Sequence, residues 1–186
     1  AFHSIVPYLD YFYGFFRQNQ GLLVEIRTKS ANQSFYREHE PLENIIIAFT
    51  LTPDEVIEKY ERHTPKLQAR IKAVNTAIAR GFKVRLCFDP IFIDPEIDHV
   101  YEPFYRHVFA QIDPGGIMDI GYGFFRMSGD FFKRIEKIRS RSLLYAEDYC
   151  MDKGVLSYPL SERERIQREH MDILSDYISK EKIFAL

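Results

Sequence analysis

Three short apolar segments, each followed at once by polar residues, constrain the fold of this chain most strongly. The apolar segments are Leu22–Val24, Ile45–Phe49 and Val84–Phe88, and the polar stretches that follow them are Glu25–Asn32, Thr50–Pro53 and Asp89-Pro90. Short apolar runs bounded by turn residues are typical of strands in a buried parallel sheet. The carboxyl ends of such strands share one edge of the sheet, where parallel α/β proteins bind their ligands. We therefore expect these polar stretches to meet at one site.

Segments with helical periodicity alternate with the strands. We expect helices over 4–18, from Thr52 to about Arg62, from Thr64 to Gly81, over 98–112, over 129–139, and from Ser161 to about Lys180. The core face of the helix from Thr64 to Gly81 should consist of Leu67, Ile71, Val74 and Ile78. Two of these starts, Thr52–Glu55 and Ser161–Glu164, have the pattern of capping boxes. We also expect strands over 117–125 and 182–186, an irregular segment over 33–44, and we assign no structure to 140–160.

This alternation predicts a single α/β domain over residues 1–186. Strands that alternate with helices form parallel sheets with right-handed crossovers. Such a set of strands forms either a small open sheet or part of a barrel. The short polar strand ends favour a parallel-stranded partial (β/α) barrel.

Composition and charge narrow the possible functions. With 25 Lys and Arg against 27 Asp and Glu, the chain is nearly neutral, so its net charge does not favour binding to nucleic acid or to an anionic membrane. No stretch approaches the roughly 18 consecutive apolar residues of a membrane span, and no signal-peptide pattern is present. Cys87 and Cys150 are the two cysteines, which favours a reduced, cytoplasmic protein. No cysteine or histidine has metal-ligand spacing, and we expect no metal site.

The polar stretch after the first strand supplies the first candidate binding residues. Lys29 could bind an anionic group as a point charge, with Ser30 and Asn32 as directional donors. The alternative is a solvated loop with an incidental lysine. Thr50 and Thr52 follow the second strand and could contact the same ligand, although Thr52 also suits the N-cap of the next helix.

Three further residues are expected near the same edge. Asp89 follows the third strand and precedes Pro90, which restricts the backbone, although an aspartate here could equally form a turn. Arg126 follows the fourth strand and would point to the same rim. His63 lies between two expected helices, where it could carry protons or act as a capping or surface residue.

Taken in order, these segments resemble the spore photoproduct lyase family of radical S-adenosylmethionine proteins. The residues that carry the resemblance are Glu25–Asn32, Phe49–Ile57, Tyr60-Glu61 with Thr64 and Arg70, Gly81–Ile91, Tyr101 with Tyr105, and Gly123–Arg126. The resemblance covers most of residues 5–139. Each piece alone is a weak signal, and the ordered set is the more specific one.

The resemblance implies the C-terminal half of a (β/α) barrel that holds S-adenosylmethionine against a [4Fe-4S] cluster. In that family the reduced cofactor gives a 5′-deoxyadenosyl radical, which in spore photoproduct lyase reverses a thymine dimer in DNA. The resemblance implies that Lys29 pairs with the methionine carboxylate of the cofactor and that Thr50 replaces a hydroxyl that helps to hold it. It also implies that Asp89 and Arg126 line the same cavity.

The chain departs from that family at the cluster. The family holds its cluster through Cys-x-x-x-Cys-x-x-Cys in the first βα loop, and Cys87 and Cys150 cannot form this motif. We therefore expect a part of a longer lyase-like enzyme that is not catalytic alone. Its expected partners are the missing N-terminal part of the barrel and DNA or a similar substrate. The alternative is a cluster-less α/β module that binds a small anionic ligand or a protein partner. In either case the edge of the first strand could support oligomerisation.

Overall fold

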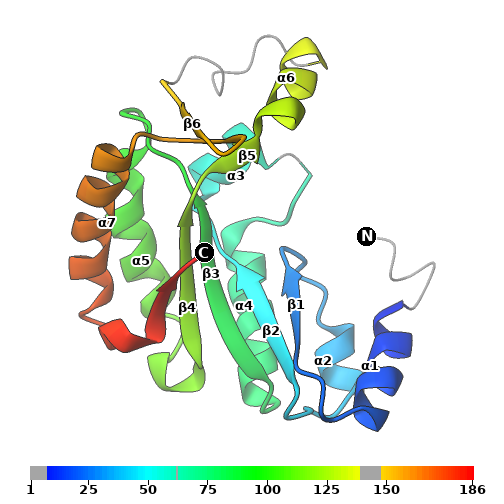
Figure 1. The fold of residues 1–186 in the computed structure, drawn as a ribbon. Coiled ribbons are helices and arrows are strands. Elements are labelled where there is room, and N and C mark those ends of the chain that lie inside the picture. Colours follow the sequence, from blue (N-terminus) through cyan, green and yellow to red (C-terminus); the bar gives the residue numbers. More distant parts are fainter. Residues whose placement is uncertain (1–7, 62, 139–147) are drawn as a thin grey trace.

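A five-stranded parallel sheet forms the centre of the protein (Figure 1). The computed structural model describes residues 8–61, 63–138 and 148–186. The strands are β1 (Val24–Thr28), β2 (Ile45–Thr50), β3 (Lys83–Ile91), β4 (Asp119–Phe124) and β8 (Ile183–Ala185), and they lie side by side in the order β1-β2-β3-β4-β8. The described strands do not close into a barrel. The predicted parallel α/β fold is confirmed as an open sheet of the kind that forms part of a (β/α) barrel.

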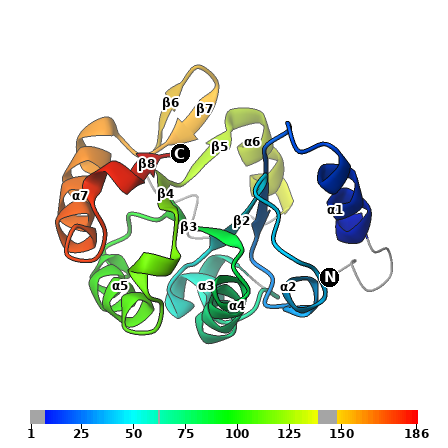
Figure 2. The ribbon, with the colours of Figure 1, turned by 90° about the horizontal axis from the view of Figure 1, so that it is seen from below.

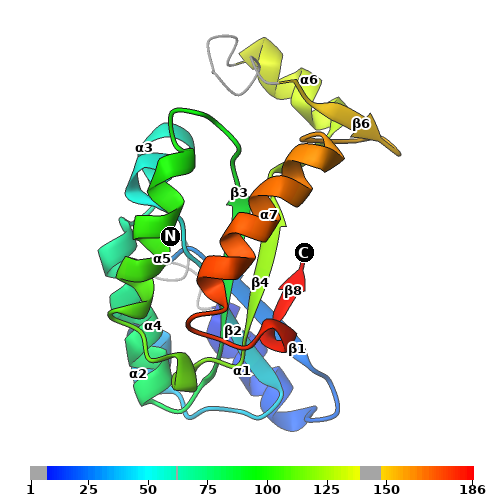
Figure 3. The ribbon, with the colours of Figure 1, turned by 90° about the vertical axis from the view of Figure 1, so that its left-hand side faces the viewer.

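The helices gather on one face of this sheet (Figures 2 and 3). They are α1 (Tyr8–Gln18), α2 (Ser34–Glu38), α3 (Asp54–Tyr60), α4 (Leu67–Ala79), α5 (Tyr101–Phe109) and α7 (Leu160–Leu174), and a short 3-10 turn, Asp98–Val100, precedes α5. Because the strand order follows the chain order, successive right-handed crossovers step in one direction and place their helices on the same side. We call this side the helix face and the opposite side the inner face.

Side chains of the strands alternate between these two faces. On β2, Ile45, Ile47 and Phe49 belong to the hydrophobic core on the helix face, whereas Thr50 ends the strand on the inner face. The predicted core face of α4 is confirmed, since Leu67, Ile71 and Val74 are buried and Ile78 packs at the margin. Gly81, with a φ of +82°, ends this helical segment in the left-handed conformation that glycine adopts without strain.

A small antiparallel sheet lies beyond the carboxyl end of β4 (Figure 1). It consists of β5 (Arg126–Ser128), β6 (Cys150–Asp152) and β7 (Val155–Ser157), with α6 (Gly129–Ile138) following β5. Lys153 and Gly154 both have positive φ, as a two-residue type I′ hairpin turn requires. This hairpin occupies the end of the segment to which the sequence assigned no structure. Residues 4–7, Arg62 and residue 139 of the expected helices lie outside the described residues, as does 140–147 of the unassigned segment.

Several sequence predictions are wrong in detail. Leu22 and Leu23 are exposed, and β1 instead runs through the polar stretch to Thr28 with alternating burial. The segment 33–44 is not irregular throughout, because it contains α2. Strand β3 continues past Asp89 to Ile91, and α7 ends at Leu174.

The two predicted capping boxes are also wrong. Pro53 and Pro159 occupy the N-cap positions of α3 and α7, and neither helix has a side-chain cap hydrogen bond. The hydroxyl of Thr52 donates instead to Glu61 Oε1, so a tertiary contact takes the place of the local cap.

A buried histidine fixes α7 to the rest of the core. His170 Nδ1 lies 3.0 Å from the Tyr105 hydroxyl on α5 and 2.8 Å from the Tyr122 hydroxyl on β4. Burial lowers the pKa of His170 to about 4, so the imidazole is neutral at pH 7.

In the part of the chain that the structure describes, no helix has the length and apolar character to cross a membrane.

Candidate functional site

A chain of ion pairs crosses the inner face of the sheet. Arg85 donates to both carboxylate oxygens of Asp119 and also pairs with Glu25. Arg27 Nε lies 3.0 Å from the other oxygen of Glu25, and Arg27 Nη1 lies 3.2 Å from Asp89 Oδ2. The strand register explains the arrangement, because Arg27 and Arg85 both lie beside Ala48 of β2, and Arg85 also lies beside Asp119 of β4.

Arg126 extends this chain at the carboxyl edge of the sheet. Its Nη1 atom lies 3.2 Å from Asp89 Oδ1, so Asp89 bridges Arg27 and Arg126. A Cβ atom at Gly123 would lie 3.0 Å from Arg126 Nη1 and 3.1 Å from Asp89 Oδ1, tighter than most real contacts. A glycine in β4 therefore leaves room for this pair. We call this set of contacts the inner-face ion pairs. It joins three arginines to three carboxylates, Arg27, Arg85 and Arg126 to Glu25, Asp89 and Asp119, so its charges balance.

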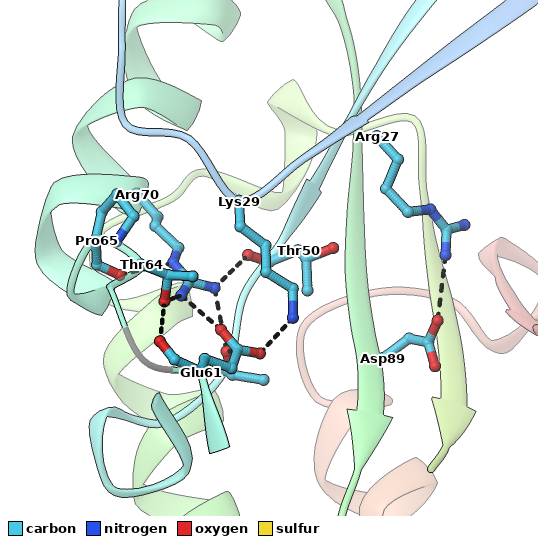
Figure 4. A network of polar contacts seen from close by, with 9 residues as sticks. Arg27, Lys29, Thr50, Glu61, Thr64, Pro65, Arg70 and Asp89 are labelled. Atoms are coloured by element: carbon cyan, nitrogen blue, oxygen red, sulfur yellow. Dashed lines mark hydrogen bonds and ion pairs between the residues drawn. The ribbon is translucent and has the colours of Figure 1, made fainter. Parts of the chain in front are cut away.

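A second polar group surrounds a fully buried arginine at the same edge (Figure 4). Arg70 of α4 donates five hydrogen bonds, to the carbonyl oxygens of Thr50 and Pro65, the hydroxyls of Thr52 and Thr64, and Glu61 Oε2 at 2.6 Å. All five guanidinium N–H groups are thus in use. We call Lys29, Thr52, Glu61, Thr64 and Arg70 the Arg70 cluster. Its arginine has no donor left for a ligand and holds the loop after β2 against α4.

Lys29 is a half-buried member of the Arg70 cluster, as is Thr64. Its ammonium group pairs with Glu61 Oε1, and about a third of its side chain (35%) is exposed. Burial alone would raise the pKa of Glu61, but the hydrogen bonds from Lys29 and Arg70 outweigh it and hold that pKa below its usual value. Glu61 also keeps its bonds to Arg70 and Thr52 without Lys29. The lysine can therefore turn to another carboxylate without leaving Glu61 unpaired.

The predicted site residues fall into two places. Lys29, Thr50 and Thr52 come together at the Arg70 cluster, with the Thr50 hydroxyl directed away from Arg70 (Figure 4). Thr52 is buried within that cluster. Asp89 and Arg126 meet in the inner-face ion pairs.

The other three predicted residues lie apart. Ser30 Oγ accepts the backbone N–H of Asn32, and Asn32 Oδ1 accepts that of Ser34, so both side chains shape the turn into α2. Ser30 and Asn32 line a hollow of about 340 Å³ together with Tyr8 and Tyr36. His63 is exposed, with a φ of +66°.

The sequence prediction missed much of the charged inner face. Glu25, Arg85 and Asp119 were not selected, and Glu61 and Arg70 were noted without a role. The sequence of β3 does contain a pattern that indicates this face. Arg85 and Asp89 are polar residues in an otherwise largely apolar strand, and their separation of four positions places both side chains on the same face of the sheet.

The cysteines of this chain do not fit a [4Fe-4S] cluster. Cys87 is fully buried in β3, where burial raises the pKa of its thiol to about 11, and Cys150 is exposed on β6. A cluster that keeps one iron open for a cofactor needs three thiolates, and this sequence has two cysteines. Among the described residues, no group of three His, Cys, Asp or Glu side chains is placed to hold a metal ion.

Comparison with known proteins identifies the fold. No family model matches the sequence, and no curated protein matches it. Solved structures of spore photoproduct lyase do match. A mutant with bound AdoMet and dinucleoside spore photoproduct gives a TM-score of 0.72 at 14% identity, and a mutant with dinucleoside spore photoproduct gives 0.75 at 14% identity. Each match covers 88% of this chain and 50% of the other chain, so the chain spans about half the length of the solved chains it matches. At this identity the similarity shows a shared fold.

Proposed function

We propose that this chain forms the cofactor- and substrate-lining part of a radical S-adenosylmethionine enzyme similar to spore photoproduct lyase, which repairs a DNA photoproduct. The observation that carries the proposal is the fold match over 88% of the chain. The Arg70 cluster and the Asp89–Arg126 pair lie at the carboxyl edge of the sheet. Ligands of parallel α/β folds bind at that edge. One matched structure contains AdoMet and dinucleoside spore photoproduct.

Lys29 is the residue we propose for the carboxylate of S-adenosylmethionine. Its ammonium group already holds the Glu61 carboxylate, and its side chain is the most accessible of the three charged side chains in the Arg70 cluster. Cofactor binding would exchange one carboxylate for another, so the lysine keeps an anionic partner in both states. Thr50, whose hydroxyl points away from Arg70, would add a hydrogen bond, and Thr52 would act through Glu61. When bound, S-adenosylmethionine supplies hydrogen-atom abstraction in this class of enzyme.

The substrate would lie against the inner-face ion pairs. Arg126 is the most exposed of the three arginines, with 43% of its side chain accessible, and Asp89 keeps Arg27 as a partner when Arg126 turns away. Arg126 is therefore suited to a phosphate of a dinucleotide. His63, Ser30 and Asn32 stay predicted site residues, with His63 on the substrate side and the other two on the cofactor side.

The cluster would have to come from outside residues 1–186. Two distant cysteines cannot bind it, so the proposal assigns its thiolates, and the remaining barrel strands, to another part of the enzyme. Residues 1–186 would then not be catalytic alone. A cytoplasmic location fits this assignment, because the chemistry needs reduced thiols.

A second candidate function is a cluster-less α/β module that binds a small anion or a protein partner. The cysteine set favours this alternative, since two cysteines are too few to hold a cluster. It differs from the first proposal in predicting no affinity for S-adenosylmethionine.

Calorimetric titration of S-adenosylmethionine into the product of the whole reading frame tests the proposal. Lys29→Ala should weaken binding at least tenfold, about the effect of losing one charge-assisted hydrogen bond. Lys72→Ala, on the exposed side of α4, is the matched control and should leave the affinity unchanged. Equal affinity of the Lys29→Ala variant and the wild type would remove Lys29 from the cofactor site.

A further inference from the structure

Helix α6 carries three exposed cations, Lys133, Arg134 and Lys137, which we call the α6 cation surface. We propose that this surface binds the phosphate backbone of a nucleic acid strand, several nucleotides away from the reacting pair. The inference rests on the proposed function and deepens it, because it extends the substrate from a dinucleotide to a longer strand. Its test does not depend on S-adenosylmethionine.

The positive charge of the α6 cation surface is not neutralised locally. Among the described residues, no carboxylate lies within ion-pair distance of its three cations, and this includes Asp130 and Glu136 of the same helix. By contrast, an exposed arginine on α5 and another on α7 each pair with a glutamate four positions away. The net charge of −2 for the whole chain therefore hides a local site for an anionic partner.

The three cations share one side of the helix. At about 100° per residue they leave α6 within an arc of about 100°. Lys133 and Lys137 lie one turn apart, a rise of about 6 Å along the axis. Lysine and arginine side chains in such a row can each contact a separate phosphate of one strand.

Contacts with the small antiparallel sheet fix the opposite side of α6. The backbone N–H of Gly129 donates to the carbonyl oxygen of Gly154 at 2.9 Å. The Phe132 ring meets the Tyr149 ring edge-on, with 5.6 Å between centroids, and Ile135 is half-buried. Because these contacts hold the apolar side of α6 toward the sheet, the cationic side faces solvent.

The α6 cation surface lies within reach of the substrate site. Arg126 begins β5, and β5 leads directly into α6, which stands beyond the carboxyl edge of the large sheet (Figures 1 and 3). Three strand residues and eight helical residues separate Arg126 from Lys137, a path of at most about 22 Å. Phosphates along one strand of a duplex lie about 3.4 Å apart, so this path corresponds to about six nucleotides. A strand held at Arg126 can therefore continue along α6.

The apolar residues of α6 favour a nucleic acid over a membrane. A helix that binds a bilayer surface inserts a broad apolar face. In α6, Phe132 and Ile135 are half-buried against the protein, which leaves Phe131 and Ile138 as its exposed large apolar residues. Contacts with phosphates require charge and no apolar face.

Fluorescence anisotropy on the product of the whole reading frame tests the proposal. The probe is a labelled DNA duplex of about 20 base pairs, longer than the path from Arg126 to Lys137. The test variant Lys133→Gln, Arg134→Gln, Lys137→Gln removes the charges and keeps residues of good helix propensity. The slope of log Kd against log salt concentration should fall by about 2–3, because each phosphate contact contributes about 0.9. At about 100 mM salt the Kd should rise roughly tenfold or more.

Two further variants separate the position of the charges from their number. The control variant Arg37→Gln, Lys72→Gln, Lys182→Gln removes as much charge from exposed residues that also lack a carboxylate partner in the described part of the chain. It should leave the Kd and the salt slope unchanged. Lys133→Arg with Lys137→Arg keeps the charge on α6 and should bind DNA like the wild type. The test variant should also keep the melting temperature of the wild type, since it breaks no ion pair.

Three results would overturn the proposal. The first is an equal Kd and an equal salt slope for the test variant and the wild type. The second is an equal loss in the test and control variants, which would mean that net charge alone acts. The third is weaker cosedimentation of the test variant with vesicles of phosphatidylcholine and phosphatidylserine at unchanged DNA affinity, which would assign the surface to a membrane.

The affinity for S-adenosylmethionine separates this proposal from the proposed function. The test variant should bind S-adenosylmethionine and dinucleoside spore photoproduct like the wild type, because neither ligand extends to α6. DNA binding that depends on α6 in a protein without affinity for S-adenosylmethionine would support the α6 cation surface and contradict the proposed cofactor. Binding of S-adenosylmethionine with DNA affinity independent of α6 would give the reverse result.

Discussion

Glu61→Ala should be among the most destabilising single substitutions in this protein, because it leaves the buried Arg70 guanidinium without its carboxylate partner. Glu61 is 8% exposed and is the carboxylate partner of Arg70, which is fully buried. The substitution leaves Arg70 with its bonds to neutral oxygens and no counter-charge. It also removes the carboxylate that accepts from Thr52 and Lys29.

The magnitude follows from the burial of the pair. Removing one partner of a buried ion pair costs about 3–5 kcal/mol of the free energy of unfolding. For a chain of this length each kcal/mol lowers the melting temperature by about 2–4 °C, so the expected decrease is about 6–20 °C. Replacing both partners, as in Glu61→Leu with Arg70→Leu, should cost less than the two single leucine variants added together, because no unpaired charge is left.

Urea denaturation followed by far-UV circular dichroism measures these differences, since the chain has no tryptophan. Glu58→Ala is the matched control, because Glu58 lies on the neighbouring helix α3 in an exposed pair with Lys66. The control should change the free energy of unfolding by less than about 1 kcal/mol. A loss below about 1 kcal/mol for Glu61→Ala, or strict additivity of the two leucine variants, would refute the view that the Arg70 cluster holds the loop after β2.

Three further predictions concern the fold. His170 has a pKa of about 4 in the folded protein and about 6.5 in the unfolded chain, so the free energy of unfolding should fall by roughly 3 kcal/mol between pH 6.5 and pH 4. Urea denaturations over a pH series measure this fall, and an equally steep dependence of the free energy of unfolding on pH in His170→Phe would contradict it. Asn44→Ala removes the side-chain amide that donates to the carbonyl oxygens of Phe16 in α1 and of Asn19 and Leu22 in the loop after it. Limited proteolysis should therefore cut residues 8–22 faster than in the wild type, with no change if α1 is held mainly by packing. A Cβ at Gly116 would lie 2.6 Å from Ile78 Cγ2, so Gly116→Ala should cost about 1–3 kcal/mol in thermal denaturation, whereas an unchanged melting temperature would mean that Ile78 can move aside.

Local sequence patterns predicted the interior of this fold well. The continuous apolar run Ile45–Phe49 forms a strand that is buried on both faces, and the helix with Leu67, Ile71 and Val74 buries the one face that its periodicity predicts. The first strand was misplaced for a physical reason. Leu22 and Leu23 have the apolar character of strand core but are exposed, and the residues after them, with alternating burial, form the edge strand.

The site was less predictable, because its contacts join distant residues. Lys29 and Glu61 lie 32 positions apart and Arg27 and Asp89 lie 62 apart, so no local pattern reveals these pairs. Thr52 has the local pattern of an N-cap, and its tertiary bond to Glu61 overrides that role. Ser30 and Asn32 were assigned to the ligand, although their spacing of two residues also fits the turn that they form.

The most direct test of the central proposal is an anaerobic S-adenosylmethionine cleavage assay on the product of the whole reading frame, reconstituted with iron and sulfide. Our account predicts an intact mass larger than the 22.1 kDa of these residues, a [4Fe-4S] spectrum, and 5′-deoxyadenosine formed in the presence of dinucleoside spore photoproduct. A product that binds no cluster, or that binds one and leaves S-adenosylmethionine intact, would contradict it and favour the binding module.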